Sequence, residues 1–228
     1  MSKVNLVGRE RELAELADIE KSPLAELVVV YGRRRVGKTW LIRNYFSNKT
    51  GVYFEAIGIY QGTLKEQLTQ FCKVISEVFY DSTAIEISES WMEAFELLTK
   101  CLGKQPKNKK LFIFIDEFPW MASPRSGIIK AFEYYWNRHW STMPNLKLII
   151  CGSSAAWLIK KIIKHKGGLH NRVTHKIRLM PFSFKETRNY LLYKGVQLSK
   201  LQLLKLYFIV GGVPFYLNQI KKNLSVNV

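Results

Sequence analysis

The sequence predicts an α/β protein built around a parallel β-sheet. Short apolar runs bounded by turn residues alternate with segments of helical period, and this alternation is typical of parallel strands joined by crossover helices. A glycine-rich loop, Gly32–Thr39, joins the first apolar run to the helical segment behind it. The clearest run, Leu111–Ile115, is wholly apolar, follows a lysine-rich polar connector and ends at two acidic residues, as expected of a strand buried on both faces.

Five strands are expected, because each segment is short, rich in β-branched or aromatic residues and bounded by polar or turn residues. They are Glu26–Tyr31, Val52–Ala56, Leu111–Ile115, Leu146–Cys151 and Val173–Leu179. We expect Leu111–Ile115 to lie at the centre of the sheet.

Helical periodicity predicts the remaining elements. They are Thr39–Phe46, Leu64–Phe79, Trp91–Leu102, Gly127–Trp140, Ala155–Lys164, Ser183–Gly195, Ser199–Val210 and the start of a further helix at Pro214–Lys222. Phe132, Trp136 and Trp140 fall four apart on one helical face, which favours a core position over a platform for stacking bases. Pro181 marks a boundary, so we predict a core over residues 1–180 and a helical subdomain over 181–228.

Composition places the chain among ordinary folded proteins. Of its 228 residues 47% are hydrophobic, the N-terminus lacks an apolar signal region, no run approaches the about 18 apolar residues that span a bilayer, and the three cysteines lie far apart. We therefore expect a cytoplasmic protein without a membrane partner. The net charge of +17 has two open interpretations: direct nucleic-acid binding, or neutralisation of nucleotide phosphates and contact with an acidic partner protein.

The loop Gly32–Thr39 matches G-x-x-x-x-G-K-[ST] between a strand and a helix, the context in which this motif cradles phosphates. Backbone N–H groups at the start of the helix bind the β-phosphate, Lys38 neutralises the β- and γ-phosphates, and the Thr39 hydroxyl ligates Mg²⁺. We predict an ATP and Mg²⁺ site from these residues: Gly32, Arg34, Arg35, Val36, Gly37, Lys38, Thr39 and Trp40. The side chains of the three loop arginines are expected to be solvated, with contact to an acidic partner as the alternative.

Two acidic residues, Asp116 and Glu117, end the most apolar strand. After a phosphate-binding loop, such a pair supplies a magnesium ligand at Asp116 and a base or orienting group for the attacking water at Glu117. The strand Leu146–Cys151 ends at Gly152-Ser153-Ser154. A hydroxyl there, which we assign to Ser153, would touch the γ-phosphate or the water; helix N-capping by Ser153 or Ser154 remains equally open.

Several motifs in order resemble the STAND-type P-loop ATPases related to AAA+ proteins, in the archaeal and bacterial ATPase-domain group. They are Leu6-Val-Gly-Arg-Glu10, the loop through Thr39, Ile115-Asp-Glu-Phe118, Cys151-Gly-Ser-Ser154, Leu179-Met-Pro-Phe-Ser-Phe184 and Gly211-Gly-Val-Pro214. The resemblance implies a P-loop NTPase three-layer sandwich of the AAA+/ASCE type, followed by the start of a helical lid. It also implies that Leu146–Cys151 lies between the strands that carry the loop and Asp116.

The same resemblance implies further site residues. Val7, Gly8 and Arg9 would lie near the adenine, Pro214 would pack on the base from the lid, and an arginine would sense the phosphates. We assign the sensor to Arg172, with a surface or aspartate-paired arginine as the alternative. Family members usually continue into a complete lid, a winged helix and an effector domain, whereas this chain ends at Val228, so we expect an incomplete lid.

Three functional hypotheses follow. The leading one is an ATP-binding, Mg²⁺-dependent ATPase that hydrolyses slowly and acts as a nucleotide-driven switch, with an unknown protein partner or effector domain and a possible oligomeric state. The alternatives are a nucleic-acid-remodelling ATPase of the AAA+ initiator or helicase-loader type, motivated by the basic charge, and a non-hydrolysing nucleotide-binding scaffold.

Overall fold

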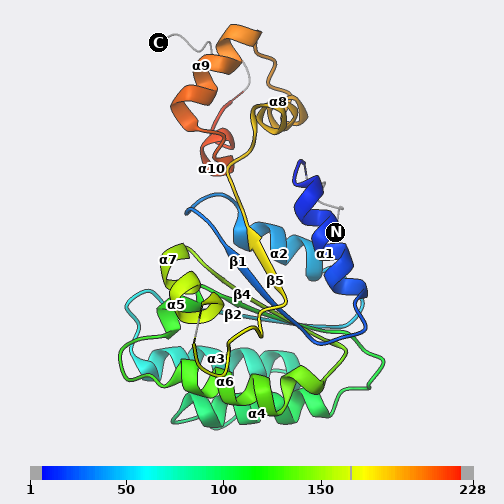
Figure 1. The fold of residues 1–228 in the computed structure, drawn as a ribbon, viewed down its shortest axis with the longest axis vertical. Helices are drawn as coiled ribbons and strands as arrows, with labels where there is room; N and C mark the ends of the chain where they lie inside the picture. The colour runs from blue at the N-terminus through cyan, green and yellow to red at the C-terminus, as the bar shows by residue number, and fades with distance from the viewer. Residues whose placement is uncertain (1–6, 165, 222–228) are drawn as a thin grey trace.

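The computed structural model describes residues 7–164 and 166–221 and contains a five-stranded parallel sheet of order β2-β3-β4-β1-β5 (Figure 1). The α/β class and the parallel sheet are confirmed. The strands are β1 (Glu26–Tyr31), β2 (Val52–Ile57), β3 (Leu111–Asp116), β4 (Leu146–Gly152) and β5 (His175–Arg178).

One placement in the sheet was wrong. The central strand is β4, which pairs with β1 on one side and β3 on the other, so β3 is second from the edge. Both β3 and β4 are buried along their whole length. Apolar character therefore distinguishes interior strands from edge strands, but it does not show which interior strand is central. The expected position of β4 between β1 and β3 agrees with the register.

Helices cover both faces of the sheet (Figure 1). Alternate side chains of β1 divide between two clusters: Leu27 and Val29 pack in one, Val28 and Val30 in the other. The first cluster is closed by α3 (Leu64–Phe79), α4 (Trp91–Gly103) and α6 (Ile128–Arg138), and the second by α1 (Glu10–Lys21) and α2 (Lys38–Phe46). This period of two is what a strand buried on both faces produces.

The predicted helix Gly127–Trp140 is shorter than expected. It ends at Arg138, and a 3-10 turn, η1 (Trp140–Thr142), carries the last of its three aromatic residues. Phe132, Trp136 and Trp140 are nevertheless all buried in the larger cluster, as the core interpretation requires. Short helices follow β3 and β4: α5 (Phe118–Met121), and α7 (Ala155–Leu158), which continues as the π-helix η2 (Ile159–Ile163).

Beyond Pro181 the chain forms a small helical unit above the carboxyl ends of the strands (Figure 1), referred to below as the lid. Its helices are α8 (Phe184–Tyr193), α9 (Lys200–Val210) and α10 (Pro214–Leu217). Capping boxes at Ser183 and Ser199 start α8 and α9. The lid has its own apolar cluster, whose buried members are Phe182, Leu191, Val196, Leu203, Leu206 and Leu217.

The last predicted helix, Pro214–Lys222, is only partly covered, because Lys222 lies outside the described residues. Within them, α10 ends at Leu217. No helix in the described part of the chain has the length and apolar character needed to cross a membrane.

Candidate functional site

The phosphate-binding loop connects β1 to α2, and its two glycines are needed for different reasons. Gly37 has φ 91° with open space around it, so its left-handed conformation demands glycine. Gly32 has φ 152°, and a Cβ there would lie 2.2 Å from the carbonyl oxygen of Leu179. Gly32 therefore lets the connector after β5 pass against the loop, a reason that the sequence motif alone did not reveal.

Lys38, Thr39 and Asp116 lie together at the start of α2. The Lys38 ammonium donates hydrogen bonds to the carbonyl oxygens of Gly32 and Arg33, both at 3.1 Å. The Thr39 hydroxyl donates to Oδ2 of Asp116 at 2.5 Å. Asp116 is buried beside Cys151, whose thiol has its pKa raised by burial and stays protonated. The hydroxyl and the carboxylate that the sequence predicts are thus in contact, and the ammonium is held by the carbonyl oxygens of the same loop.

Glu117 is the N-cap residue of α5 and has a left-handed backbone, φ 45°. This turn aims its carboxylate at the end of the neighbouring strand β4, where Oε2 accepts hydrogen bonds from the backbone N–H and the hydroxyl of Ser153, both at 3.0 Å. Ser154 begins α7 without a side-chain capping bond. Ser153 therefore contacts the proposed base, and neither serine side chain caps α7.

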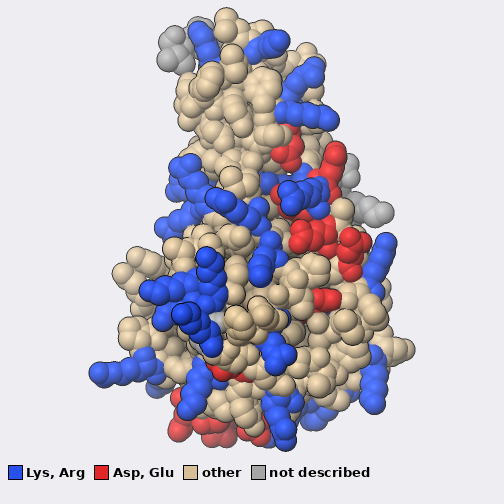
Figure 2. All heavy atoms as spheres, viewed as in Figure 1, with Lys and Arg blue, Asp and Glu red and all other residues tan. Residues whose placement is uncertain are grey.

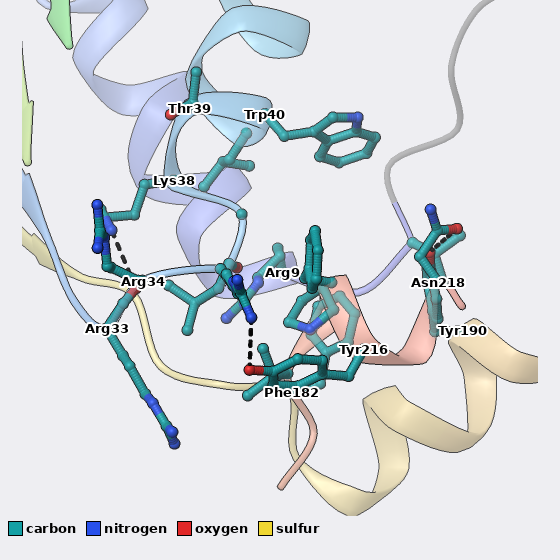
Figure 3. A pocket seen from close by; sticks show the side chains of 18 of the residues that line it. Arg9, Arg33, Arg34, Lys38, Thr39, Trp40, Phe182, Tyr190, Tyr216 and Asn218 are labelled. Carbon is teal, nitrogen blue, oxygen red and sulfur yellow. Dashed lines mark hydrogen bonds between the residues drawn. The ribbon is translucent and has the colours of Figure 1, made fainter. Parts of the chain in front are cut away.

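A cavity of about 950 Å³ lies between the loop, the N-terminal segment and the lid (Figure 3). A cavity of this size accommodates a nucleotide. Most predicted ligand-binding residues line it: Val7, Arg9, Arg34, Arg35, Val36, Gly37, Lys38, Thr39, Trp40, Glu117 and Pro214. Asp116 and Ser153 lie behind this lining, bonded to Thr39 and Glu117.

The lid supplies a wall that the sequence analysis missed, apart from Pro214. It consists of Phe182, Tyr190, Tyr193, Val213, Phe215, Tyr216 and Asn218, and Figure 3 shows Phe182, Tyr190 and Tyr216 on the side of the cavity away from Lys38 and Thr39. These residues are not regularly spaced along the helices of the lid, so helical periodicity does not single them out. The one signal in the sequence is the gathering of aromatic residues around the Gly-Gly-Val-Pro motif, and Tyr193 and Phe215 are largely exposed.

Arg9 joins three parts of the protein. Its guanidinium donates to the carbonyl oxygens of Met180 at 2.6 Å and Val36 at 3.0 Å, and lies 4.6 Å from the ring centroid of Phe182. Burial lowers its pKa, partly offset by nearby Glu12 and Glu186. Gly8 does not line the cavity; it packs against Glu186 and Phe182. The N-terminal element thus forms a cavity wall at Val7 and Arg9, with Gly8 behind it.

The loop arginines are not simply solvated. Arg35 donates from Nη1 to the hydroxyl of Tyr216 at 2.9 Å, and its guanidinium lies 4.6 Å from the ring centroid of Phe215. Arg34 lies 5.8 Å from the ring centroid of Trp120. All three loop arginines are exposed, as expected, and Arg35 in addition contacts α10, which folding brings over the loop.

Arg172 is not part of this site. It is exposed and precedes β5, whose first residue pairs with Val28, near the amino end of β1. The phosphate-binding loop follows the carboxyl end of β1, so Arg172 lies at the opposite end of the strands. Motif order placed this arginine near the phosphates, whereas strand direction excludes it.

The oxygen atoms of Thr39 and Asp116 fit a magnesium ion. Mg²⁺ prefers hard oxygen ligands and is usually held by one or two protein side chains together with substrate phosphates and water. No group of three or more histidine, cysteine or acidic side chains in the described ranges forms a metal cage of protein ligands alone. A site completed by the phosphates of the nucleotide matches this donor set.

Comparison with known proteins identifies the family. Residues 6–220 match the model of an ATPase domain found predominantly in Archaea, so the chain belongs to that family. An uncharacterized protein of Methanocaldococcus jannaschii is 29% identical over 215 residues, covering 94% of this chain and 44% of the relative. The chain therefore spans less than half the length of that curated relative.

Solved structures share the fold. A Walker-type ATPase of Pyrococcus abyssi superposes with a TM-score of 0.64 at 20% identity, over 93% of this chain and 65% of the other. A STAND protein with a tetratricopeptide repeat sensor from Pyrococcus horikoshii gives 0.57 at 22%, over 97% and 31%. Drosophila ORC bound to DNA gives 0.58 at 15%, over 94% and 54%. At these identities the likeness establishes the P-loop ATPase fold alone.

Proposed function

We propose that this member of the archaeal ATPase family is a nucleotide-driven switch of the STAND type, which binds ATP with Mg²⁺ and hydrolyses it slowly. The observation that carries the proposal is the cavity itself, because its walls come from both the loop and the lid. A nucleotide there would touch residues 1–180 and 181–228 together, and its binding free energy would favour the arrangement that contacts it on both sides.

The triphosphate would lie along the loop. Backbone N–H groups at the start of α2 and the Lys38 ammonium would hold the phosphates, and Mg²⁺ bound through Thr39 and Asp116 would neutralise developing charge. The base would pack between Pro214 and the aromatic lid wall, close to Val7 and Arg9. The bond from Arg35 to Tyr216 links the phosphate loop directly to α10, so a shift of the loop would be transmitted to the lid.

Glu117 would take a proton from the water that attacks the γ-phosphorus, as the bond to the leaving oxygen breaks and ADP and phosphate form. Its contact with Ser153 orients the carboxylate and limits its freedom. Ser153 is a positioning residue in this proposal. Arg172 lies outside the site, so another group would have to sense the phosphates.

The test replaces Glu117 and measures binding and turnover separately. We expect Glu117→Gln to lower ATP hydrolysis by about 10²-fold or more, the contribution of a positioned base, while calorimetry finds nucleotide affinity almost unchanged. The exposed Glu86→Gln is the matched control and should hydrolyse at the parental rate. A Glu117→Gln protein as fast as its parent would refute the assignment of the base.

A second variant tests the binding site itself. Lys38→Ala removes the charge from the loop and should weaken ATP binding by about tenfold to a hundredfold, the value of a charge-assisted contact. Unchanged affinity would remove the basis of the whole proposal. The scaffold alternative predicts intact binding with no product; phosphate release in a single-turnover assay of the parent would exclude it.

A nucleic-acid-remodelling ATPase is the second candidate, favoured by the net charge of +17 and by the resemblance in fold to ORC, which is bound to DNA in the neighbouring structure. This function predicts that duplex DNA at low salt stimulates hydrolysis, and that the effect disappears as salt rises. A rate that is independent of added DNA and RNA at low salt would favour the switch over the remodeller.

A further inference from the structure

A second hollow, of about 580 Å³, lies away from the nucleotide site between α6 and η2. We call it the lysine groove, and its lining residues are Ile129, Lys130, Glu133, Lys160, Lys161, Lys164 and Lys166. All five lysines are exposed. None forms a salt bridge within the described part of the chain, so the groove presents five lysines against one glutamate.

The helical backbone that carries Lys160, Lys161 and Lys164 is anchored to the core. Leu158 and Ile162, four residues apart, are completely buried and fix α7 and η2 to the body of the protein. The widened π-helical turn leaves Lys160, Lys161 and Lys164 on the solvent side, and π-helical turns occur frequently at functional sites.

Gly168 ties the segment that carries Lys166 to α6. The Glu133 carboxylate accepts the backbone N–H of Gly168 at 2.6 Å, and the Asn137 amide donates to the carbonyl oxygen of the same glycine at 2.8 Å. A Cβ at Gly168 would lie 2.2 Å from Glu133 Oε1, so a larger residue there would displace the Glu133 carboxylate. Because the Glu133 carboxylate is occupied by this bond, it fixes the segment that carries Lys166.

The chemistry of the lining selects one class of ligand. A protein partner is usually met by aromatic, methionine or arginine side chains at the core of the interface, and the only apolar residue here is the half-buried Ile129. The same lack of exposed apolar residues disfavours insertion into a lipid surface. A row of lysine point charges instead matches a chain of phosphates.

The lining also lacks groups that read bases. It contains no aromatic ring on which an unpaired base would stack, and no asparagine, glutamine or arginine to form paired hydrogen bonds with base edges. Contacts to the backbone alone position a duplex without regard to its sequence. Figure 2 shows Lys and Arg side chains gathered over the region where Figure 1 places α7, which extends the positive surface around this part of the molecule.

We propose that the lysine groove between α6 and η2 binds the phosphate backbone of duplex nucleic acid without sequence specificity. The proposal rests on the second candidate function and assigns it a surface. The groove is connected to the nucleotide site along the chain, since η2 continues α7, which begins two residues after the Ser153 that contacts Glu117.

The experiment measures fluorescence anisotropy of a labelled DNA duplex of about 20 base pairs in about 50 to 200 mM salt. The test variant is Lys160→Gln/Lys161→Gln/Lys164→Gln. The matched control is Lys104→Gln/Lys107→Gln/Lys109→Gln, which removes the same charge from three exposed lysines around the connector between α4 and β3. Both variants should keep the parental rate of ATP hydrolysis without DNA, which verifies folding.

We expect the test variant to bind on the order of a hundredfold more weakly at about 0.1 M salt, with the slope of log affinity against log salt reduced by about three. The control should change little in affinity and slope. Equal weakening of both variants would overturn the groove and leave nucleic-acid binding standing. Failure of the parent to bind DNA or RNA duplexes at low salt would overturn the groove and the remodelling function together, while the ATP switch would still be judged by Glu117→Gln.

Discussion

At the scale of single residues, Lys147 stands out because it is a completely buried cation at the start of β4. Its ammonium donates to the carbonyl oxygens of Ser22 at 3.0 Å, Pro144 at 3.3 Å and Leu24. Burial lowers its pKa to about 8, and the nearby charge of Lys110 acts in the same direction. The residue therefore holds the loop before β1 and the turn before β4 together at an electrostatic cost.

The unfavourable burial of the Lys147 charge predicts that the stability of the protein depends on pH. Between about pH 8 and pH 10 the unfolded chain keeps the Lys147 proton that the folded protein loses, so the free energy of unfolding should rise with pH, by at most about 1.4 kcal/mol per pH unit. Below pH 8 the contribution is constant, because both states are protonated. Urea titrations at several pH values measure the slope, and tyrosine ionisation confines them to below about pH 10.

Lys147→Met should lack this rise, because an apolar side chain of similar length carries no proton. The exposed Lys185→Met should keep it. Identical slopes for the parent and Lys147→Met would show that the buried ammonium keeps an ordinary pKa.

At the scale of elements, the connection between α9 and α10 determines how the lid meets the cavity. Gly211 and Gly212 both have left-handed backbones, with φ 62° and 67°. A Cβ at Gly211 would meet nothing within 4 Å, whereas one at Gly212 would lie 2.0 Å from the carbonyl oxygen of Phe182. The Gly212 carbonyl also accepts the backbone N–H of Phe182 at 2.8 Å, so the second glycine fixes α10 to the start of the lid.

We expect Gly212→Ala to displace α10 and weaken ATP binding by about tenfold or more, because roughly 1.4 kcal/mol of lost contact with the lid wall corresponds to a factor of ten. Gly211→Ala has a similar backbone conformation and no steric clash, so it should cost about 1 kcal/mol of stability and leave the affinity nearly unchanged. Calorimetry of both proteins makes the comparison. Equal affinities would mean that the lid wall contributes nothing to binding.

At the scale of the whole molecule, the cavity lies where two separately packed parts meet. Core and lid have distinct apolar clusters, and their contacts around the cavity include Arg9 with Phe182 and Arg35 with Tyr216. A ligand that touches both walls should stabilise the folded chain as one unit.

Thermal unfolding measures this stabilisation. At a nucleotide concentration about a hundred times the dissociation constant, the gain of about 2.7 kcal/mol should raise the Tm by about 5 to 10 °C. EDTA should reduce the Tm shift, because it removes the Mg²⁺ that Thr39 and Asp116 would bind together with the phosphates. Lys38→Ala, with an affinity about tenfold to a hundredfold lower, should keep only about 1.4 to 0.4 kcal/mol of this gain at the same concentration, and its Tm shift should fall in proportion. A Tm that does not respond to ATP with Mg²⁺ would contradict the assignment of the cavity.

The sequence by itself determined the phosphate-binding loop, the acidic pair, the strand positions and the α/β class. These depend on residues close together in the chain, where spacing fixes which side chains share a turn or a strand end. The motif therefore predicted Lys38, Thr39 and Asp116 correctly as neighbours once the strands were assumed parallel.

Only the tertiary structure decided the rest. Strand direction removed Arg172 from the site, pairing made β4 the central strand, and packing brought Tyr216 to Arg35 across an interval of 181 residues. It also assembled the lysine groove from α6 and η2, elements that follow different strands. Such neighbours are set by how helices and sheet pack in three dimensions, and local periodicity carries no record of that packing.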